Sequence, residues 1–202
     1  MSQALSANPP PQSALSLYRN CFAALLRPSI ATYKMLGEQR VSLWHAYMLM
    51  FVSSLLGGAI DSLAPFGSQL LGQGSIDVLL LTMIPVAALI AVGSLAAFAW
   101  AAQTVARFFK GSGTYVQLAY VLAAISAPLL IVTSIVDQIP AVRMFLIVVY
   151  LYWLVQYVVA IRAVNGLAWV KAVAAVLLAL LLLGLLWLGV AALLGYSGIL
   201  LP

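Results

Sequence analysis

Five long apolar stretches dominate this sequence and limit what it can fold into. The hydrocarbon core of a bilayer is about 30 Å thick, and an α-helix crosses it with about 20 apolar residues. Each of the five stretches is at least this long. We therefore predict an all-α, polytopic membrane protein with five transmembrane helices in one bundle. The predicted spans cover residues 43–63, 78–107, 115–136, 142–161 and 168–194.

The composition indicates a membrane location rather than a soluble fold. Hydrophobic residues make up 65% of the 202 residues and charged residues 6%, and the mean hydropathy is +1.14. An ordinary soluble domain is about 25% charged, so this chain has too few polar groups to cover a surface in water. The segments between the spans are short, which favours antiparallel neighbours in a single membrane domain, residues 43–202.

The nine Lys and Arg residues are distributed unevenly around the spans. When five spans alternate in direction, eight of the nine fall on one side, and Arg143 falls on the other. Because cytoplasmic loops of membrane proteins carry an excess of Lys and Arg, we expect a cytoplasmic N-terminus and a C-terminus on the outer side. The eight are Arg19, Arg27, Lys34, Arg40, Arg107, Lys110, Arg162 and Lys171.

The segment before the first span divides into a tail and an amphipathic part. Residues 1–12 are polar and rich in proline, which is typical of a disordered tail. In residues 13–42, apolar side chains recur every three or four positions, and Pro28 separates two pieces too short to cross a bilayer. This basic segment can lie among lipid headgroups, in contact with anionic lipid, or pack on the cytoplasmic end of the bundle. The sequence leaves both positions open.

Small residues within the spans indicate where helices approach one another. Lipid tails are as apolar as leucine, so helices in a bilayer associate through close packing at small residues. Gly93, Ala97 and Ala101 are four residues apart on one face of the second span, and Gly57 and Gly58 lie in the first. We expect helix contacts at these positions, within one chain or between copies in a homo-oligomer.

Two prolines and three polar residues lie inside the predicted spans. Pro85 and Pro128 each remove a backbone donor, so each is expected to kink its helix. Gln103, Ser126 and Gln156 are expected to form hydrogen bonds with neighbouring helices. The alternative is that these residues converge, together with the prolines, on a polar site at the bilayer midplane, as in a small transporter or channel.

Groups that could carry out catalysis are scarce within the spans. Asp61 is the carboxylate nearest to a span interior, and it lies one turn inside the outer end. His45 is the one histidine and Cys21 the one cysteine, so the ligands for a zinc or haem site are too few. The basic residues form no run that could follow a phosphate backbone. We therefore expect no enzymatic activity, no cofactor or metal, and no nucleic-acid partner.

The stretch KGSGT, residues 110–114, raises the choice between a phosphate-binding loop and a turn between two spans. A Walker loop has the pattern GxxxxGK[ST] after a strand. Here the lysine precedes the glycines, and no alternation of strands and helices surrounds it. Thr114 is suited to cap the third span by accepting a bond from a backbone N–H two or three residues later. We interpret the stretch as a tight turn at the cytoplasmic end of the bundle.

The sequence that follows this turn resembles the middle of the YIP domain, the family of Ypt/Rab-interacting membrane proteins. GSGTYVQLAYVLAAISAPLLI, residues 111–131, is similar to the family's GxG[ST][YF]xQL turn, which a tyrosine and a mid-span proline follow. LLRPSIATYKMLGEQ, residues 25–39, and AIRAVNGLAWVKAVAAVLL, residues 160–178, resemble flanking segments of the family. The matching positions are Gly111, Gly113, Tyr115, Gln117, Leu118, Tyr120, Pro128, Gly166 and Lys171.

This resemblance covers residues 20–195 and implies a five-span membrane protein with a cytoplasmic N-terminus. For eukaryotic members it implies Rab binding and membrane trafficking, but this chain lacks their acidic region with its DLxGP motif. The short tail and minimal loops resemble the bacterial branch, which implies a multi-pass protein of the inner membrane with a periplasmic C-terminus. We expect a non-enzymatic adaptor or organiser that acts through protein or lipid contacts, and a small transporter or channel is the alternative.

Overall fold

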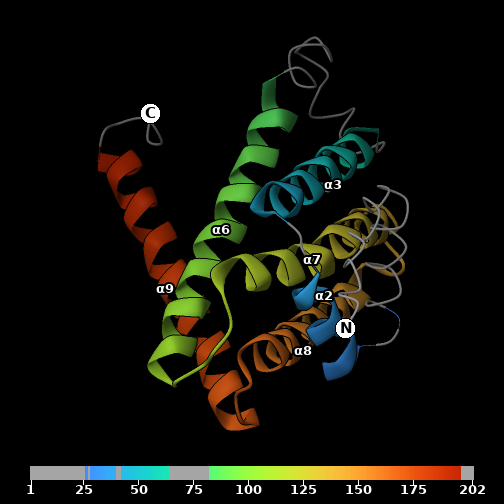
Figure 1. Cartoon of the computed structure of the whole chain (residues 1–202). Helices are drawn as coiled ribbons and strands as arrows, with labels where there is room; N and C mark the ends of the chain where they lie inside the picture. The colour runs from blue at the N-terminus through green and yellow to red at the C-terminus, as the bar shows by residue number, and fades with distance from the viewer. Residues whose placement is uncertain (1–25, 27, 40–41, 64–81, 197–202) are drawn as a thin grey trace, which may run out of the picture.

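The computed structural model describes residues 26, 28–39, 42–63 and 82–196, and within them the chain is helical and has no strand. The tail of residues 1–12, residues 13–25 of the amphipathic segment, and Arg40 lie outside the described residues. Figure 1 shows how the helices are arranged. In chain order they are α2 (Ile30–Glu38), α3 (Leu43–Leu63), α6 (Ile84–Phe108), α7 (Tyr115–Asp137), the short 3-10 helix η2 (Arg143–Phe145), α8 (Leu146–Asn165) and α9 (Trp169–Tyr196).

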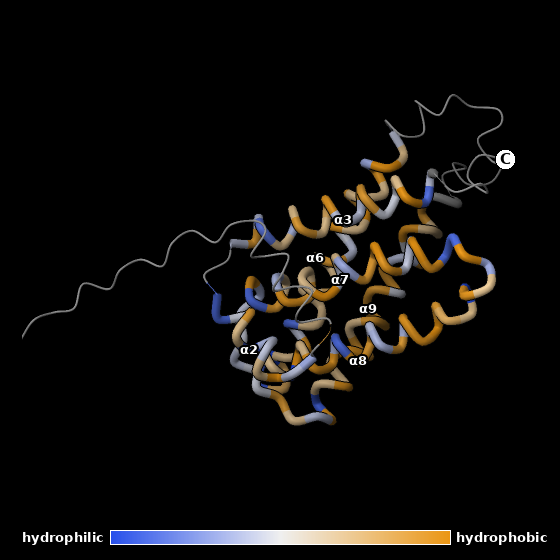
Figure 2. Tube along the Cα trace, turned by 90° about the vertical axis from the view of Figure 1, so that its right-hand side faces the viewer, coloured by the Kyte–Doolittle hydropathy of each residue, from blue (hydrophilic) through white to orange (hydrophobic). Residues whose placement is uncertain are grey.

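Five of these helices are long and apolar enough to cross a membrane, which confirms the predicted fold class. The hydrophobic colour in Figure 2 runs along the long helices, and the most hydrophilic positions gather towards their ends. The fourth spanning helix differs from the prediction at both ends, because α8 begins at Leu146 rather than 142 and continues to Asn165 rather than 161. The start predicted for the second span, residue 78, lies outside the described residues. The fourth helix ends where Gly166 adopts the left-handed conformation, with φ +66°.

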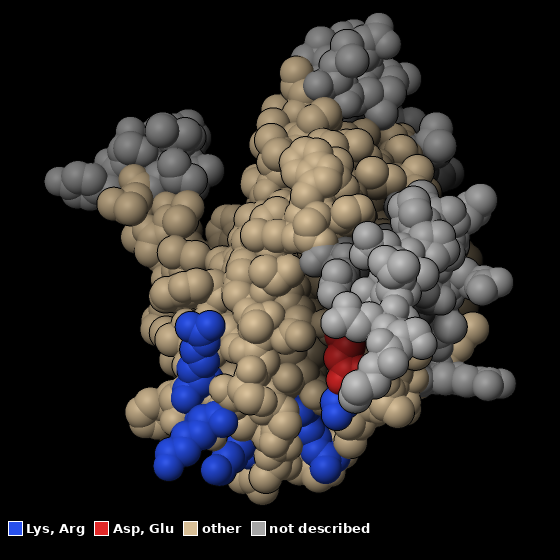
Figure 3. Space-filling model, in the orientation of Figure 1, with Lys and Arg blue, Asp and Glu red and all other residues tan. Residues whose placement is uncertain are grey.

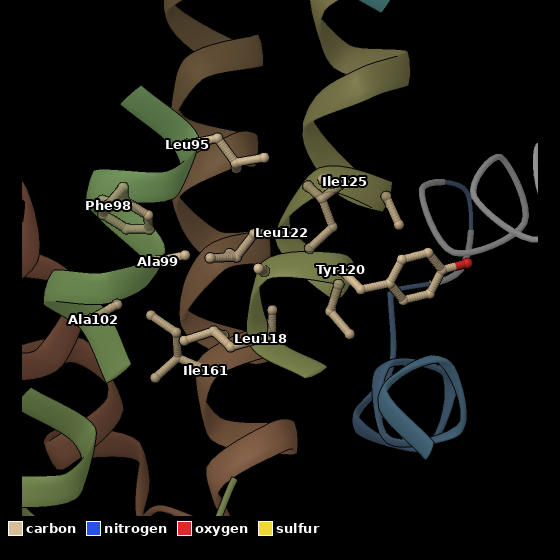
Figure 4. Packing of buried hydrophobic residues seen from close by; sticks show 14 of the residues in the cluster. Leu95, Phe98, Ala99, Ala102, Leu118, Tyr120, Leu122, Ile125 and Ile161 are labelled. Atoms are coloured by element: carbon tan, nitrogen blue, oxygen red, sulfur yellow. The ribbon is translucent and has the colours of Figure 1, made fainter. Parts of the chain in front are cut away.

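Helix α7 is the central element of the bundle. Every residue from 118 to 129 is buried, so neighbours surround this part of the helix on all sides. It packs against α2, α3, α6 and α8. Alanines at positions such as 119, 123 and 127 allow these neighbours to approach closely, which is how helices associate in a bilayer. In Figure 4, Leu118 and Leu122 of α7 point towards the side on which Phe98 of α6 and Ile161 of α8 lie.

The two span prolines occupy different positions in their helices. Pro128 lies inside α7, as predicted, and removes one backbone donor from the helix interior. Pro85 lies in the first turn of α6, and Thr82 and Met83, which directly precede this helix, are π-helical. Because residues 64–81 lie outside the described residues, the kink expected at Pro85 stays a prediction.

Helix α2 packs on the bundle through one face. Ser29 caps its start by accepting a bond from the Thr32 N–H at 3.0 Å. Tyr33 and Leu36 are fully buried, and the helix contacts α7 and α8. Burial, with a further contribution from Tyr152, raises the pKa of the Tyr33 hydroxyl above its ordinary value. Of the two positions that the sequence left open, residues 30–38 therefore take the one on the bundle.

Candidate functional site

The turn between α6 and α7 is held against the end of α8. Lys110 takes the left-handed conformation, with φ +65°, and the Gly111 N–H donates to the Ala106 carbonyl at 2.8 Å. A Cβ at Gly113 would lie 2.7 Å from the Val164 carbonyl oxygen, and one at Gly111 would lie 2.9 Å from the Asn165 Cβ. Both glycines are thus required because α8 approaches the turn too closely for any side chain.

Hydrogen bonds fasten this turn to three helices. Gln103 of α6 donates from Nε2 to the Gly113 carbonyl at 2.6 Å, and the Ser112 N–H donates to the Asn165 carbonyl at 3.2 Å. Thr114 and Gln117 form a capping box at the start of α7, with bonds of 3.4 and 3.0 Å between side chain and backbone. The tight turn and the Thr114 cap expected from the sequence are therefore both present.

The two tyrosines of the GxGTYxQLxY stretch lie in the bundle. The Tyr115 hydroxyl is 2.7 Å from the Tyr47 hydroxyl of α3 and donates to the Ala96 carbonyl of α6 at 3.3 Å. One side chain of α7 thereby links two neighbouring helices. Tyr120 is buried, and Figure 4 shows its ring pointing away from Leu122, towards the side on which α2 lies. Tyr115 thus holds three helices together, and Tyr120 belongs to the buried core.

The positions proposed for a midplane site do not all lie at one place. Pro85 and Gln103 are 18 residues apart on α6, which corresponds to about 27 Å along a helix. Ser126 pairs with the Tyr157 hydroxyl of α8 at 2.7 Å. Gln156 is 1% exposed, and its amide has no hydrogen-bond partner among the described residues. A groove of about 450 Å³ along α8 and α9 reaches Tyr157, whereas neither Ser126 nor Gln156 lines it.

The small residues differ in what surrounds them. A Cβ at Gly57 would lie 3.0 Å from the Ser134 Oγ, and one at Gly58 would lie 2.9 Å from Ile84. On α6, Ala101 is buried, whereas a Cβ at Gly93 would meet no atom within 4 Å. Gly93 and Ala97 instead line a groove of about 240 Å³ whose other wall is α9 of the same chain.

Charged side chains occupy the two ends of the bundle in an unequal way. We call one end the basic end. It contains the last turns of α6 and α8, the α6–α7 turn and the first turn of α9. On the face drawn in Figure 3, the Lys and Arg side chains all lie towards this end. Its members are Arg107 and Arg162 in the last turns of their helices, Lys110 in the turn, and Lys171 near the start of α9.

The opposite end carries carboxylates that have partners. Asp61 accepts bonds from the Gln138 Nε2 at 3.0 Å and the Ser134 Oγ at 3.4 Å, and Asp137 pairs with Arg143 at 2.8 Å. Asp77, which the topology prediction also places at this end, lies outside the described residues. The two ends thus differ in charge among the residues that the structure describes.

Sequence reasoning did not identify several of these contacts. The pairs Tyr47–Tyr115 and Ser126–Tyr157 join residues 68 and 31 positions apart, and no local pattern predicts such pairs. The bonds of Asp61 were missed for the same reason. For Tyr157 there was one signal, because a hydroxyl in the middle of a span needs an acceptor or donor from a neighbouring helix.

Comparison with known proteins supplies the family. The Yip1 domain matches the chain over residues 22–191, which includes the turn, the capping box, the first four spans and most of the fifth. No curated protein and no solved structure matches the chain. The match spans more than half of the chain, and the matched residues include the five helices that could cross a membrane in whole or in part. The chain is a multi-pass membrane protein of the Yip1 domain family.

Proposed function

We propose that this protein is a non-enzymatic membrane adaptor that binds a protein partner through the outward face of α2. The observation that carries the proposal is that α2 is fixed to the bundle by Tyr33 and Leu36, both fully buried. A helix held in this way presents its other face in a constant orientation. That face carries Ile30 and Met35, together with the Lys34–Glu38 pair, whose charged atoms are 4.0 Å apart.

The proposal also draws support from where polar residues lie in the bundle. Pro85 and Gln103 are near opposite ends of α6, so a midplane site that includes both of them would need a different helix arrangement. This separation favours the adaptor over the alternative of a small transporter or channel, for which Ser126 and Gln156 remain as candidate residues. Fixed, exposed apolar and charged side chains on α2 are suited to a protein contact.

Site-specific photo-cross-linking in cells tests the adaptor role. A photoreactive residue replaces Met35, which is 55% exposed on α2, or Leu151, which is 58% exposed on the apolar surface of α8. We expect a discrete protein adduct from position 35 and none from position 151, because the second position faces lipid. The adduct should disappear when Ile30→Glu changes the same face. Equal cross-linking from both positions, or an adduct that persists in Ile30→Glu, contradicts the proposal.

We further propose that the protein lies in a bacterial inner membrane with its N-terminus and basic end in the cytoplasm. The unequal charge of the two ends supports this orientation. A membrane-impermeant thiol reagent tests it in intact cells that carry Lys171→Cys or Gln138→Cys in a Cys21→Ser background. We expect labelling at position 138 without lysis and at position 171 only after lysis. The reverse pattern contradicts the orientation.

A further inference from the structure

The basic end brings together cations from three helices. The Ser112–Asn165 hydrogen bond at 3.2 Å, and the close approach of Gly111 to Asn165, join the α6–α7 turn to the end of α8. Three residues separate the end of α8 from the start of α9, and α9 packs against α6. Arg107, Lys110 and Lys171 are exposed there, and Figure 3 shows blue side chains close together at this end.

These cations have no carboxylate partner among the described residues. Each described acidic side chain is engaged elsewhere: Glu38 with Lys34, Asp137 with Arg143, and Asp61 with Gln138. Arg162 lies over the ring of Trp169, with its guanidinium carbon 4.2 Å from the ring centroid. Stacking uses the face of the guanidinium, so the N–H groups on its edge remain available to an anionic acceptor.

Exposed apolar side chains border the same cations. Phe108 follows Arg107 and is 83% exposed, and Val170 precedes Lys171 and is 81% exposed. A free anion in water would gain nothing from such neighbours. An anionic lipid, in contrast, has a phosphate for the cations and acyl chains for the apolar residues. Cations next to exposed apolar side chains therefore favour an amphiphilic anion over a soluble one.

We propose that the basic end is a binding site for the headgroup of an anionic phospholipid. The phosphate accepts hydrogen bonds from Arg107, Lys110, Lys171 and the edge of Arg162, and the acyl chains lie along Phe108 and Val170. The site is separate from the outward face of α2, where Lys34 is already paired with Glu38. It goes beyond the adaptor role and does not depend on it.

Lipid binding to the purified full-length protein in detergent tests this site. Native mass spectrometry compares phosphatidylglycerol with phosphatidylcholine. Removing one cation is expected to weaken phosphatidylglycerol affinity about fivefold, so Arg107→Gln and Lys171→Gln together should weaken it about 25-fold. Phosphatidylcholine affinity should not change. Arg143→Gln, which removes one charge at the opposite end, serves as the matched control and should keep the full affinity.

Three results overturn the proposal. The first is equal affinity for the two lipids, and the second is an equal loss in Arg143→Gln and in the single variants at the basic end. The third is displacement of phosphatidylglycerol by millimolar inorganic phosphate, which would identify a site for the free anion. A decrease in affinity of the unchanged protein with rising NaCl is expected, since the contact is electrostatic. That measurement needs no variant, so it tests the site even where a substitution affects folding.

Discussion

Gly113→Ala is expected to destabilise the bundle by about 3 kcal/mol, at the upper end of the range for inserting atoms into a packed site. The added methyl group would lie 2.7 Å from the Val164 carbonyl oxygen and 2.8 Å from the Asn165 Oδ1. A backbone oxygen at the end of a helix cannot move aside without breaking the contact between the turn and α8. Unfolding in a fixed detergent, followed by helical circular dichroism, measures the loss.

Two other glycines provide graded controls for this result. Gly166→Ala is expected to cost about 1 kcal/mol, because the left-handed conformation of Gly166 strains any side chain although space is open around it. Gly184 lies inside α9, and a Cβ added there would meet no atom within 4 Å. Gly184→Ala should therefore not lower stability, since alanine favours a helix. If Gly113→Ala is as stable as Gly184→Ala, the described contact between the turn and α8 is wrong.

Leu36→Asp is expected to release α2 from the bundle. Leu36 of α2 is fully buried where this helix packs against α7 and α8. An unpaired charge placed in such a site costs about 3–5 kcal/mol of folding free energy. Detachment of α2 exposes the new carboxylate to water and removes this cost. Little stability is lost with it, because a helix of nine residues contributes little stability of its own. Hydrogen exchange of the α2 amides should become fast, while the exchange of α7 stays slow.

Met35→Asp is the matched control for this release. Met35 is the neighbouring residue and is largely exposed, so the same charge there meets water or headgroups. Exchange in α2 should then remain slow. Slow exchange in Leu36→Asp, or equally fast exchange in both variants, would show that the burial of Leu36 does not hold the helix in place.

The sequence was sufficient to predict the number of spans, because hydrocarbon thickness sets the length of each apolar stretch. Charge asymmetry was also visible at this level, since it depends on counting residues at span ends. The position of Pro85 was not, because a span boundary is uncertain by several residues when its flank is also apolar. The predicted span begins at residue 78 and holds Pro85 in its interior, whereas Ile84 begins the α-helix α6 one residue before Pro85 and π-helical residues precede it.

Contacts between spans were less accessible to prediction. We expected a helix contact at both Gly58 and Gly93, because both are small residues within a span. Gly58 lies against Ile84, whereas Gly93 faces a groove. The difference depends on how α3, α6 and α9 are oriented, and nearly uniform apolar sequences do not encode that orientation in a periodic pattern. The two glycines of the α6–α7 turn were recognisable as a turn signal, but the closeness of α8 that requires them was not.

Docking of α2 on α7 is the central feature of this account, because it fixes the proposed partner surface to the bundle. The Cβ position of Gly37 lies 3.8 Å from the Cβ of Gln117, which is the mean separation across a disulfide. Gly37→Cys with Gln117→Cys, in a Cys21→Ser background, should therefore cross-link almost completely when isolated membranes are oxidised. Met35→Cys with Gln117→Cys should not, since Met35 is exposed on the other face. Mass spectrometry of the joined peptides decides the matter: a 37–117 disulfide supports the docked helix, and its absence, or equal cross-linking from position 35, contradicts it.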